Sequence, residues 1–483
     1  MTSERPPLEP LRSSRRVRFL SDQQLDDLRA ATLRILEEVG VKFPSDRALR
    51  IFEEHGASVD RETQIVRLAP DLVMRAMATV PRYFTMAARD PSLDLVLQDG
   101  VTWFTNDGCG VETIDFETGL ARPSTKADVA AMARVADYLP SIGFIWPMVS
   151  AQDKGRTSPL HEMDACWGST MKHVQSETIM GAAHCRYALE MATVLAGSRE
   201  ELRRRPNFSL VVCTIAPLLQ DQPGIEGALE LAAAGVPVGF LSMPTLGTTA
   251  PATMAGALAL GDAEIISATV LLQLAHPGTP VFHSIMQAWA DPRTGTYVGY
   301  PLDQRARYAP VEMAHHWGMP SLGACYGTDA QRPGTWQAAA DVALDPFWAG
   351  LVGPEIVTGM GLVKTYTRLH AESIILDNDL YQRARYALLD LDVSPETLAL
   401  DVIANVGPAG HFLAEQHTRK YMRHAMVRGL THELTPPSGY RDPIEVARER
   451  VRTILETHHV EPIEPAKQAE LTRILAAADR ELG

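Results

Sequence analysis

The sequence predicts an α/β fold, a (β/α)8 barrel of the TIM type with a helical N-terminal region and a helical C-terminal extension. Eight short apolar runs alternate with longer helical patterns, as repeated βα units do. Runs such as FSLVVC (208–213) are apolar throughout, which is typical of parallel strands buried on both faces. An open doubly wound sheet is the alternative, but the GxGxxG turn expected after its first strand is absent.

The apolar runs and the patterns between them define the predicted barrel. We expect strands at residues 101–106, 143–149, 172–176, 209–214, 236–242, 280–286, 321–325 and 355–361. Helical apolar spacing covers residues 124–138, 177–196, 224–234, 252–275, 302–316 and 336–351. The predicted divisions are an N-terminal arm and helical region (1–100), the barrel (101–368) and a helical C-terminal extension packed on the barrel (369–483).

The N-terminal region opens with a Pro- and Arg-rich stretch, residues 1–18, that we expect to be disordered or draped over the surface. Ser21 then precedes a run with helical apolar spacing and is a candidate helix N-cap. Two further amphipathic stretches follow, near residues 45–55 and 70–78. These patterns predict helices that lie outside the barrel.

The charge and composition exclude several classes of protein. Asp and Glu (59) outnumber Lys and Arg (45), giving a net charge of −14, which disfavours nucleic acid as a partner. A chain with 46% hydrophobic and 22% charged residues is globular rather than disordered or fibrous. The acidic balance also suits a cationic small substrate, although solubility alone accounts for it.

The cysteines and the N-terminus bear on location. The five cysteines are odd in number and include no CxxC pair, which favours a reducing, cytoplasmic environment. Residues 1–18 lack the apolar stretch of a signal peptide, and no run approaches the roughly 20 apolar residues of a membrane span. We therefore expect a cytoplasmic protein that binds no membrane and that can form a homo-oligomer.

In a barrel of this kind the active site forms at the C-terminal ends of the strands. A quaternary ammonium ion cannot donate a hydrogen bond, so proteins hold it with aromatic faces and nearby carboxylates. Four aromatic side chains near predicted strand ends could form such a cage or could pack in the core. The residues near these ends are Trp103, Phe104, Asn106, Asp107, Trp146, Gln175, Glu177, Thr214, Ser242, Met243, His283, Ser284, Gln287, Tyr326 and Asp329.

One histidine near a strand end has two interpretations. His283, in the run PVFHSIM, can contact an anionic part of a substrate, or it can be a core histidine whose ring nitrogens are hydrogen-bonded within the protein. Together with Cys213 and Cys325, which end strands, it could also hold zinc, although structural thiols are common. HExxH, GxSxG, P-loop and paired-carboxylate motifs do not stand out. The residues alone thus predict an α/β-barrel enzyme with an aromatic, partly polar pocket and no metal site.

Several segments resemble the trimethylamine methyltransferase family, in family order from about residue 20 to the C-terminus. They are DFETGLARPSTKADV (115–129), IAPLL (215–219), TLGTTAPATMAGALALGDAE (245–264), GTDAQ (327–331) and GHFLAEQHT (410–418). The GTTAPATMAG and GHFLAEQHT segments are the most specific. With the GHFL histidine added, the candidate substrate-binding residues are Trp103, Phe104, Asn106, Trp146, Gln175, His283, Tyr326, Asp329 and His411.

The resemblance also indicates which branch of the family the chain is similar to. The family's founder carries pyrrolysine beyond the seventh strand, near the place where this chain reads CYGTDAQ (325–331). The chain therefore resembles the pyrrolysine-lacking branch, whose characterised members demethylate quaternary amines such as glycine betaine. Near residues 331–337 it departs from the family pattern, with Gln331 where Lys is usual and no Asp before Gln337.

The activity that the resemblance implies is transfer of a methyl group from a quaternary amine to Co(I) of a corrinoid (cobalamin) carried by a separate protein. No tightly bound cofactor is expected in this chain. A quaternary nitrogen already carries a positive charge, so the tertiary amine leaves without a general acid, and the protein's task is positioning. The alternatives are a zinc-dependent or other barrel enzyme and a non-catalytic protein that binds a quaternary amine.

Overall fold

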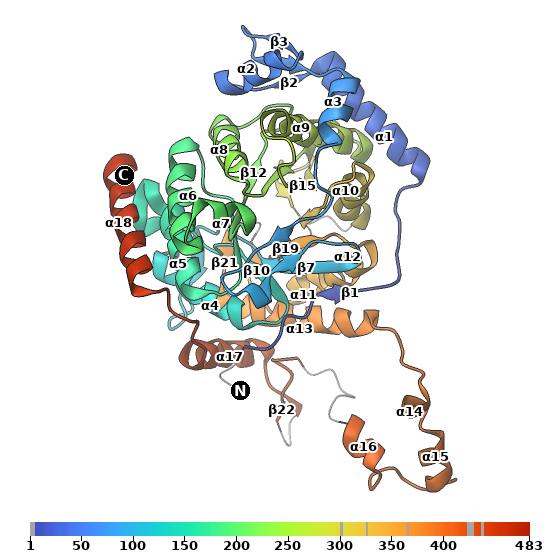
Figure 1. The fold of residues 1–483 in the computed structure, drawn as a ribbon. Helices are drawn as coiled ribbons and strands as arrows, with labels where there is room; N and C mark the ends of the chain where they lie inside the picture. Colours follow the sequence, from blue (N-terminus) through green and yellow to red (C-terminus); the bar gives the residue numbers. More distant parts are fainter. Residues whose placement is uncertain (1–4, 300–302, 325–326, 365–366, 423–428, 436–438) are drawn as a thin grey trace.

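The computed structural model describes residues 5–299, 303–324, 327–364, 367–422, 429–435 and 439–483 (Figure 1). Within these ranges, eight parallel strands form the central barrel. They are β7 Val101–Asn106, β10 Ile142–Ile145, β11 His173–Ser176, β12 Phe208–Cys213, β13 Val238–Ser242, β15 Val281–Ile285, β18 Leu322–Ala324 and β19 Ile356–Met360. Each lies inside or within a residue or two of a predicted run, so the predicted (β/α)8 barrel is confirmed.

The strands follow one another around the ring in chain order, with β19 returning to pair with β7. The last gap, between β15 and β18, is closed by a bridge between His283 and Ser321. There the His283 amide donates to the carbonyl oxygen of Pro320 at 3.0 Å. The sheet therefore has no long unpaired edge, as expected of a closed barrel.

The barrel interior is packed below its C-terminal end. Gly239 of β13 pairs in register with Phe282 of β15. A Cβ on Gly239 would lie 1.7 Å from the Phe282 ring, so only glycine leaves room for that ring. Because side chains fill the lower part of the barrel, a ligand has access only at the C-terminal ends of the strands.

Helices surround the strands (Figure 1). The helices that cover the barrel are α4 Lys126–Tyr138, α5 Ser158–Ser169, α6 Ala182–Ala196, α8 Gln222–Ala234, α9 Met254–Ala275, α10 Gln304–His316, α12 Asp345–Val352 and α13 Ala371–Leu388. Helix α13 follows the eighth strand, so the barrel's own secondary structure extends past the boundary predicted at residue 368. The helix predicted over 336–351 is two helices, α11 Trp336–Val342 and α12, because Asp345 and Pro346 start a new helix.

Helix α9 corrects one expectation about the membrane. It has 22 residues and a mean hydropathy of 1.6, so by length and composition it could cross a bilayer. Yet 83% of its apolar window is buried inside the protein, and the buried carboxyl groups of Asp262 and Glu264 lie on it. The expectation that no segment is so long and apolar is therefore wrong. The helix is apolar because it packs against the barrel, α1 and α3.

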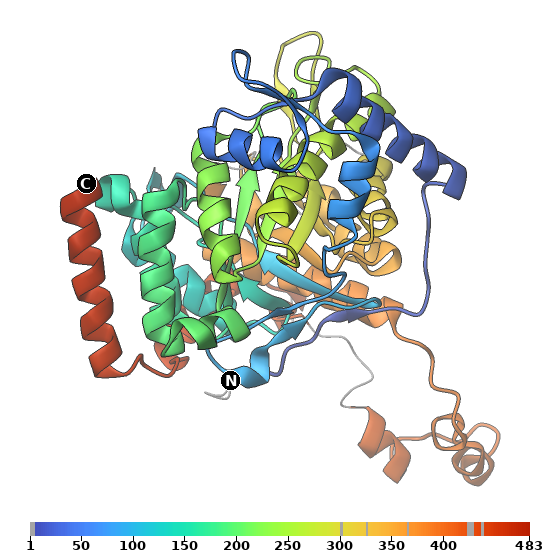
Figure 2. The same cartoon turned by 45° about the horizontal axis from the view of Figure 1, so that its top comes forward.

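The N-terminal region lies against one side of the barrel, along α9 and α10 (Figures 1 and 2). Residues 11–12 form strand β1, Leu11–Arg12, which pairs antiparallel with β7. Helix α1, Asp22–Arg34, begins at the predicted cap: Ser21 Oγ accepts from the Gln24 amide, and Gln24 Oε1 accepts from the Ser21 amide. The other predicted stretches form α2 Asp46–Glu54 and α3 Pro70–Met77. A small sheet lies beside α2 in the N-terminal region. It consists of β2 Val41–Lys42, β3 Ser58–Asp60 and β4 Ile65–Arg67.

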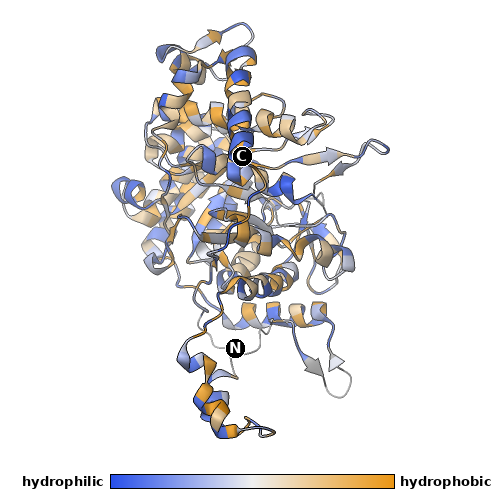
Figure 3. Ribbon diagram, turned by 90° about the vertical axis from the view of Figure 1, so that its right-hand side faces the viewer, coloured by the Kyte–Doolittle hydropathy of each residue, from blue (hydrophilic) through white to orange (hydrophobic). Residues whose placement is uncertain are grey.

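The C-terminal extension has two parts. Helices α17 Pro443–Thr457 and α18 Pro465–Leu482 pack on the barrel helices, α17 on α13 and α4 and α18 on α6. Residues 391–422, here called the C-terminal arm, contain α14 Pro395–Leu398, α15 Leu400–Val406 and α16 Gln416–Tyr421. All three overall views show this arm standing away from the body (Figures 1 to 3).

Candidate active site at the C-terminal end of the barrel

A chain of hydrogen bonds fixes the indole ring of Trp146 at the end of β10. Trp146 Nε1 donates to Gln175 Oε1 at 2.6 Å, and Gln175 Nε2 donates to Ser209 Oγ at 2.8 Å. Ser209 Oγ also lies 2.9 Å from His173 Nε2. Burial lowers the pKa of His173 to about 4, so this imidazole is neutral. Its Nδ1, 2.8 Å from the Ala87 carbonyl oxygen, carries the proton, and Ser209 donates to Nε2.

Asn106 joins the ends of two neighbouring strands. Its Nδ2 donates to the carbonyl oxygens of Asp107 and Trp146, at 2.7 and 2.6 Å, and its Oδ1 accepts from the Trp146 amide at 3.3 Å. The side chain is fully buried. Asn106 therefore holds the residue after β7 and the residue after β10 at a fixed separation.

Two carboxyl groups lie near this ring in the loops after β7 and β11: Asp107, which is buried, and Glu177, which is partly buried and shares with the indole the space around Gly108. Burial and the charge of Glu177 raise the pKa of Asp107 well above its usual range. Burial also raises the pKa of Glu177 to about 7, against the effect of a hydrogen bond with Cys109. Among the described residues, neither carboxyl group forms an ion pair with Lys, Arg or His. A cation bound here would favour the ionised carboxylates and find no competing positive charge.

Glu162 holds two loops at the strand ends, the loop after β10 and the loop after β11, which carries Glu177. Glu162 of α5 accepts hydrogen bonds from the Ala151 amide at 3.0 Å and from Thr178 Oγ1 at 2.6 Å. Thr178 is the residue after Glu177, so the bond from Thr178 to Glu162 anchors the loop after β11, here called the acidic loop. Cys109 has a φ of 62°, unusual for a residue other than glycine, and its amide donates to the Pro147 carbonyl oxygen. Strained backbone of this kind is typical of functional sites.

Gly108 lies where the indole ring, the acidic loop and the backbone converge. A Cβ at this position would lie 2.8 Å from Glu177 Oε1, 3.0 Å from Trp146 Cε3 and 3.1 Å from the Pro147 carbonyl oxygen. Each of these distances is shorter than ordinary van der Waals contact. The absence of a side chain at Gly108 is what lets the aromatic ring and the carboxylate approach each other.

Three of the predicted site residues lie elsewhere, which corrects the expected cage. Phe104 packs edge-on against Tyr381 of α13, with ring centroids 5.1 Å apart, because it points outward from the barrel wall. Trp103 lies near the start of β7, with Nε1 3.5 Å from the Val96 carbonyl oxygen, at the opposite end of the strand from Asn106. His283 also points outward, and its Nε2 lies 2.8 Å from Asp262 Oδ1 of α9.

The outward orientation of His283 also separates the proposed zinc ligands. Leu241, which pairs with both Cys213 and Ser284, places these two on one face of the wall, whereas His283 faces the helices. Among the described residues, no group of three or more His, Cys, Asp or Glu side chains is placed to hold a metal ion. Cys325 lies outside the described residues. Cys213 and His283 therefore cannot share one ion.

The remaining candidates lie near or beyond the seventh strand. Tyr326 lies outside the described residues. Asp329 is partly buried in the segment after β18, next to Thr328, whose Oγ1 contacts Asp341. His411 is exposed on the C-terminal arm, away from the barrel (Figure 1). Of the predicted substrate-binding residues, the structure thus brings together Asn106, Trp146 and Gln175.

The sequence places Asp107 and Glu177 near strand ends, but neither was included in the predicted substrate-binding set. Asp107 and Glu177 each come directly after a strand, and this position was the signal that could have selected them. Gly108 and Cys109 carried no such signal, because their importance lies in contacts between loops. Ser284 Oγ is buried and has no hydrogen-bond partner in the part of the chain that is described.

Comparisons with known proteins agree with this architecture. The family model for trimethylamine methyltransferase (MTTB) matches residues 3–483. A trimethylamine methyltransferase MttB of Desulfitobacterium hafniense is 32% identical over 469 residues, covering 96% of this chain and 94% of that protein. MttB2 of Methanosarcina mazei is 31% identical, covering 94% of each chain. A glycine betaine methyltransferase of Desulfitobacterium hafniense is 26% identical, covering 96% of this chain and 98% of that protein.

The likeness extends over the whole length of the chain and of its relatives, so it includes the barrel, the N-terminal helices and the C-terminal extension alike. The segments that suggested the resemblance, including the GHFL stretch, lie within the matched residues. By this match the chain belongs to the trimethylamine methyltransferase family.

Proposed function

We propose that this protein transfers a methyl group from a quaternary amine, glycine betaine or a related betaine, to the Co(I) of a corrinoid carried by a separate protein. The observation that carries the proposal is the pair of carboxyl groups of Asp107 and Glu177 at the strand ends, which form no ion pair among the described residues; Glu177 lies near the indole of Trp146 across Gly108. Aromatic faces and carboxylates are the groups that hold a quaternary ammonium ion. The family membership and the likeness to a glycine betaine methyltransferase support methyl transfer as the reaction.

In the proposed reaction, the bond between nitrogen and one methyl carbon breaks, and its electron pair stays on nitrogen as a neutral tertiary amine leaves. A corrinoid, as the second substrate, would supply the electron pair for the new cobalt–carbon bond. No proton has to be delivered to the leaving nitrogen, so the site needs no general acid. The chain's contribution is to hold the cation in line, which can lower a barrier by several kcal/mol.

The sign of the electrostatics sets a limit on how the site can work. The positive charge on nitrogen disappears as the methyl group departs, so tight electrostatic binding of the cation alone would oppose the reaction. We therefore expect an incomplete cage that leaves one methyl group exposed to the acceptor.

The cellular setting belongs to the same proposal. Reduced corrinoids need a reducing compartment, and the four cysteines in the described residues are free thiols. We propose a cytoplasmic location on this basis.

The direct test is to incubate the purified protein with cob(I)alamin and a panel of quaternary amines, and to follow the absorbance of the methylated corrinoid. We expect product with at least one betaine. Trimethylamine, a tertiary amine, serves as the comparison substrate. No product with any quaternary amine, in the presence of a competent corrinoid protein, would contradict the proposal.

A matched pair of variants links the activity to the site. Glu177→Gln should lower kcat/KM by about tenfold or more, because it removes a carboxylate beside the cation. Glu190→Gln, an exposed change on α6, should leave it unaltered. If calorimetry shows that an amine binds but is not turned over, the result would favour a non-catalytic binding protein. If zinc copurifies with the protein and is lost on replacing Cys213, the result would favour a metalloenzyme.

A further inference from the structure

The C-terminal arm, residues 391–422, makes its own contacts but none to the barrel among the described residues. Its backbone hydrogen bonds join residues of the arm to one another, for example the Ile403 amide to the Ala399 carbonyl oxygen. Its one ion pair, Lys420 with Glu396, also lies within it. None of its side chains belongs to the buried core. The arm is thus attached to the body by covalent chain alone, so far as the structure describes it (Figure 3).

The arm exposes an unusual amount of apolar surface. Leu413 is 85% exposed and Leu391 is 84% exposed. The other exposed large apolar side chains of the arm are Val393, Leu398, Leu400, Ile403, Phe412 and Met422. Eight exposed large apolar side chains within 32 residues are a substantial part of the roughly 20–30 residues that one partner contributes to a standard interface. A soluble protein rarely leaves so large an apolar patch in water.

The helices of the arm are too short to be stable by themselves. Helices α14, α15 and α16 have 4, 7 and 6 residues. Isolated helices shorter than about 12 residues are marginal in water, and short helices in proteins owe their stability to packing. No described hydrogen bond, ion pair or core packing supports these helices from the body, so we expect them to be stabilised by a surface on another molecule.

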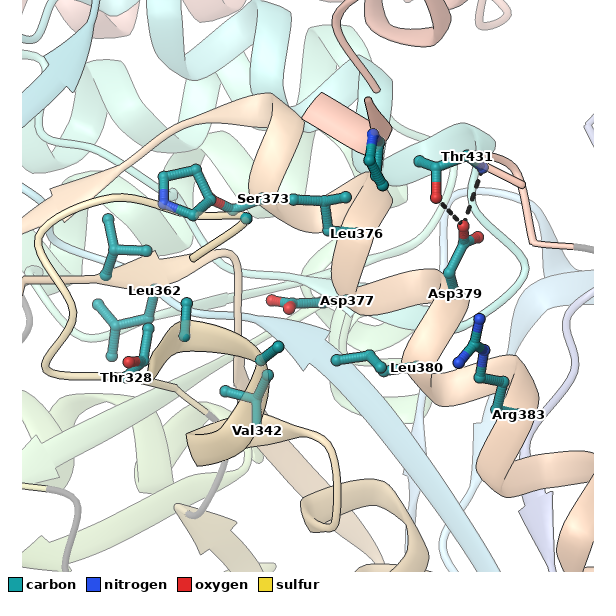
Figure 4. Close-up of a pocket in the computed structure, with 16 residues that line it drawn as sticks. Thr328, Val342, Leu362, Ser373, Leu376, Asp377, Asp379, Leu380, Arg383 and Thr431 are labelled. Carbon is teal, nitrogen blue, oxygen red and sulfur yellow. Dashed lines mark hydrogen bonds between the residues drawn. The ribbon is translucent and has the colours of Figure 1, made fainter. Parts of the chain in front are cut away.

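An apolar cavity of about 230 Å³ lies beside the base of the arm. Figure 4 shows Val342, Leu362 and Leu380 around it. At the other side of the cavity, the carboxylate of Asp379 already accepts hydrogen bonds from the Thr431 amide and hydroxyl. The cavity is therefore suited to apolar side chains.

The position of this cavity connects it to the arm. Helix α13, which forms one wall, leads directly into the arm, and Thr431 and Pro443, which follow the arm, line the same cavity. The arm thus leaves and returns at the rim of the cavity without filling it. Contacts in a two-fold pair are reciprocal, so a chain whose arm packs on a second chain would receive the arm of that chain on its own cavity.

We propose that the C-terminal arm is an exchange element that packs on a second copy of this chain, with apolar side chains of the arm in the cavity between α11 and α13 of the partner. A second copy is the occupant because the number of exposed apolar side chains suits a stable interface rather than a brief encounter. A constitutively helical apolar arm also needs a partner that is present whenever the protein is folded. Another copy of the same chain meets that condition.

Sedimentation velocity of the full-length protein at micromolar concentration tests this proposal. We expect a dimer or a larger even-numbered assembly. Leu413→Asp should raise the dissociation constant at least about 30-fold, as expected for an interface hot spot. Leu120→Asp is the matched control, because Leu120 is 69% exposed on the turn between β8 Glu112–Ile114 and β9 Ala121–Pro123, far along the chain from the arm.

A second variant tests the receiving surface independently. Ala339 is exposed at the rim of the cavity, so Ala339→Arg should block entry of the arm and also weaken the assembly, with the thermal midpoint of the monomer unchanged. Hydrogen exchange should show protected amides in α15 and α16 of the wild type and rapid exchange in both variants.

Three results would overturn the proposal. These are a wild-type protein that is monomeric with a fast-exchanging arm, an assembly that survives both variants, and an arm that becomes protected only when a corrinoid protein is added. The last result would assign the arm to that partner instead. Amine binding by the variants separates this outcome from failure of the proposed function, since the arm makes no described contact with the barrel.

Discussion

The indole Nε1 of Trp146 donates a 2.6 Å hydrogen bond to Oε1 of Gln175 across the neighbouring strands β10 and β11. Gln175 is held in turn by Ser209, which pairs with it in register on β12. The ring is therefore oriented by the barrel itself, before any ligand arrives. A preorganised aromatic face lowers the entropic cost of binding a cation.

Replacing Gln175 by Met tests this orientation. The change keeps the volume but leaves the buried indole N–H without an acceptor. We expect the free energy of unfolding to fall by about 1–3 kcal/mol, the cost of a buried unsatisfied donor. Affinity for a quaternary amine should also fall, by about tenfold. Urea unfolding and calorimetry measure the two effects, with Gln337→Met, at an exposed position, as the control; equal stability of the two variants would refute the argument.

The pH dependence of amine binding follows from Glu177, whose pKa burial raises to about 7. A bound permanent cation favours the ionised carboxylate and lowers this pKa. Binding therefore releases a proton below pH 7 and releases none well above it. We expect the affinity to rise by up to about fivefold between pH 6 and pH 7, by up to about tenfold between pH 6 and pH 8, and to level off above pH 8. Calorimetry in two buffers of different ionisation enthalpy measures the released proton.

Glu177→Gln provides the control for this prediction, because the amide cannot titrate in this range. The variant should bind more weakly at pH 8 and should show a flatter pH profile, apart from any contribution of Asp107, whose pKa is also raised. A wild-type affinity that fell as the pH rose from 6 to 8 would have the wrong sign for a carboxylate that faces the cation.

The fold was predictable because its signals are local. Each barrel strand is a short apolar run, and Ser21 and Ser45 cap helices with their own side chains. Helix α5 was not among the named helices, because its apolar residues surround buried polar ones such as Glu162, which blurs the apolar spacing. The split between α11 and α12 depends on Asp345, which is buried by an ion pair with Arg307 of another helix.

The site was predictable only in part, because side-chain direction depends on how the barrel curves. Phe104 and Asn106 are two residues apart on one strand, where simple alternation would place them on the same face. The pairing of β7 shifts register between these positions on both sides, against β10 and β19. Phe104 thus points outward to α13 while Asn106 joins the strand ends. No pattern in the sequence revealed this shift.

The contact between Asp137 and His458 predicts how acid affects the C-terminal extension. Burial acts to raise the pKa of Asp137, but hydrogen bonds with His458 and Thr170 and the charge of Lys172 lower it to about 2. A lowered carboxyl pKa contributes stability that is present above pH 4 and is lost as the pH falls toward 2. Asp137→Ala should therefore destabilise the protein by about 3 kcal/mol or more at pH 7, since it leaves buried donors unpaired.

Urea unfolding across pH measures this effect. The difference between Asp137→Ala and the wild type should shrink as the pH falls from about 4 to 2, because the wild-type carboxylate becomes protonated as well. His458→Ala should reproduce part of the loss, since its Nε2 lies 2.8 Å from Asp137 Oδ2 and ties the end of α17 to α4. A deficit that did not vary with pH would show that packing, and not the charge, is responsible.

Gly108→Ala tests the close approach that assembles the proposed site. Its Cβ would displace Glu177 Oε1, 2.8 Å away, and the indole edge of Trp146, 3.0 Å away, while the Pro147 carbonyl oxygen at 3.1 Å blocks the remaining direction. We expect a loss of stability of about 1–3 kcal/mol, as for overpacking. Amine affinity should fall by at least tenfold, because both groups that face the cation must move.

Gly168→Ala is the matched control, because Gly168 lies within α5 and a Cβ there would meet nothing within 4 Å. That variant should bind the amine normally and be more stable by up to about 1 kcal/mol, the gain of alanine over glycine inside a helix. Calorimetry and urea unfolding of the two variants side by side decide the matter. If Gly108→Ala retained full affinity, the indole and the carboxylate could not both contact the bound cation, and the binding site would have to lie elsewhere along the strand ends.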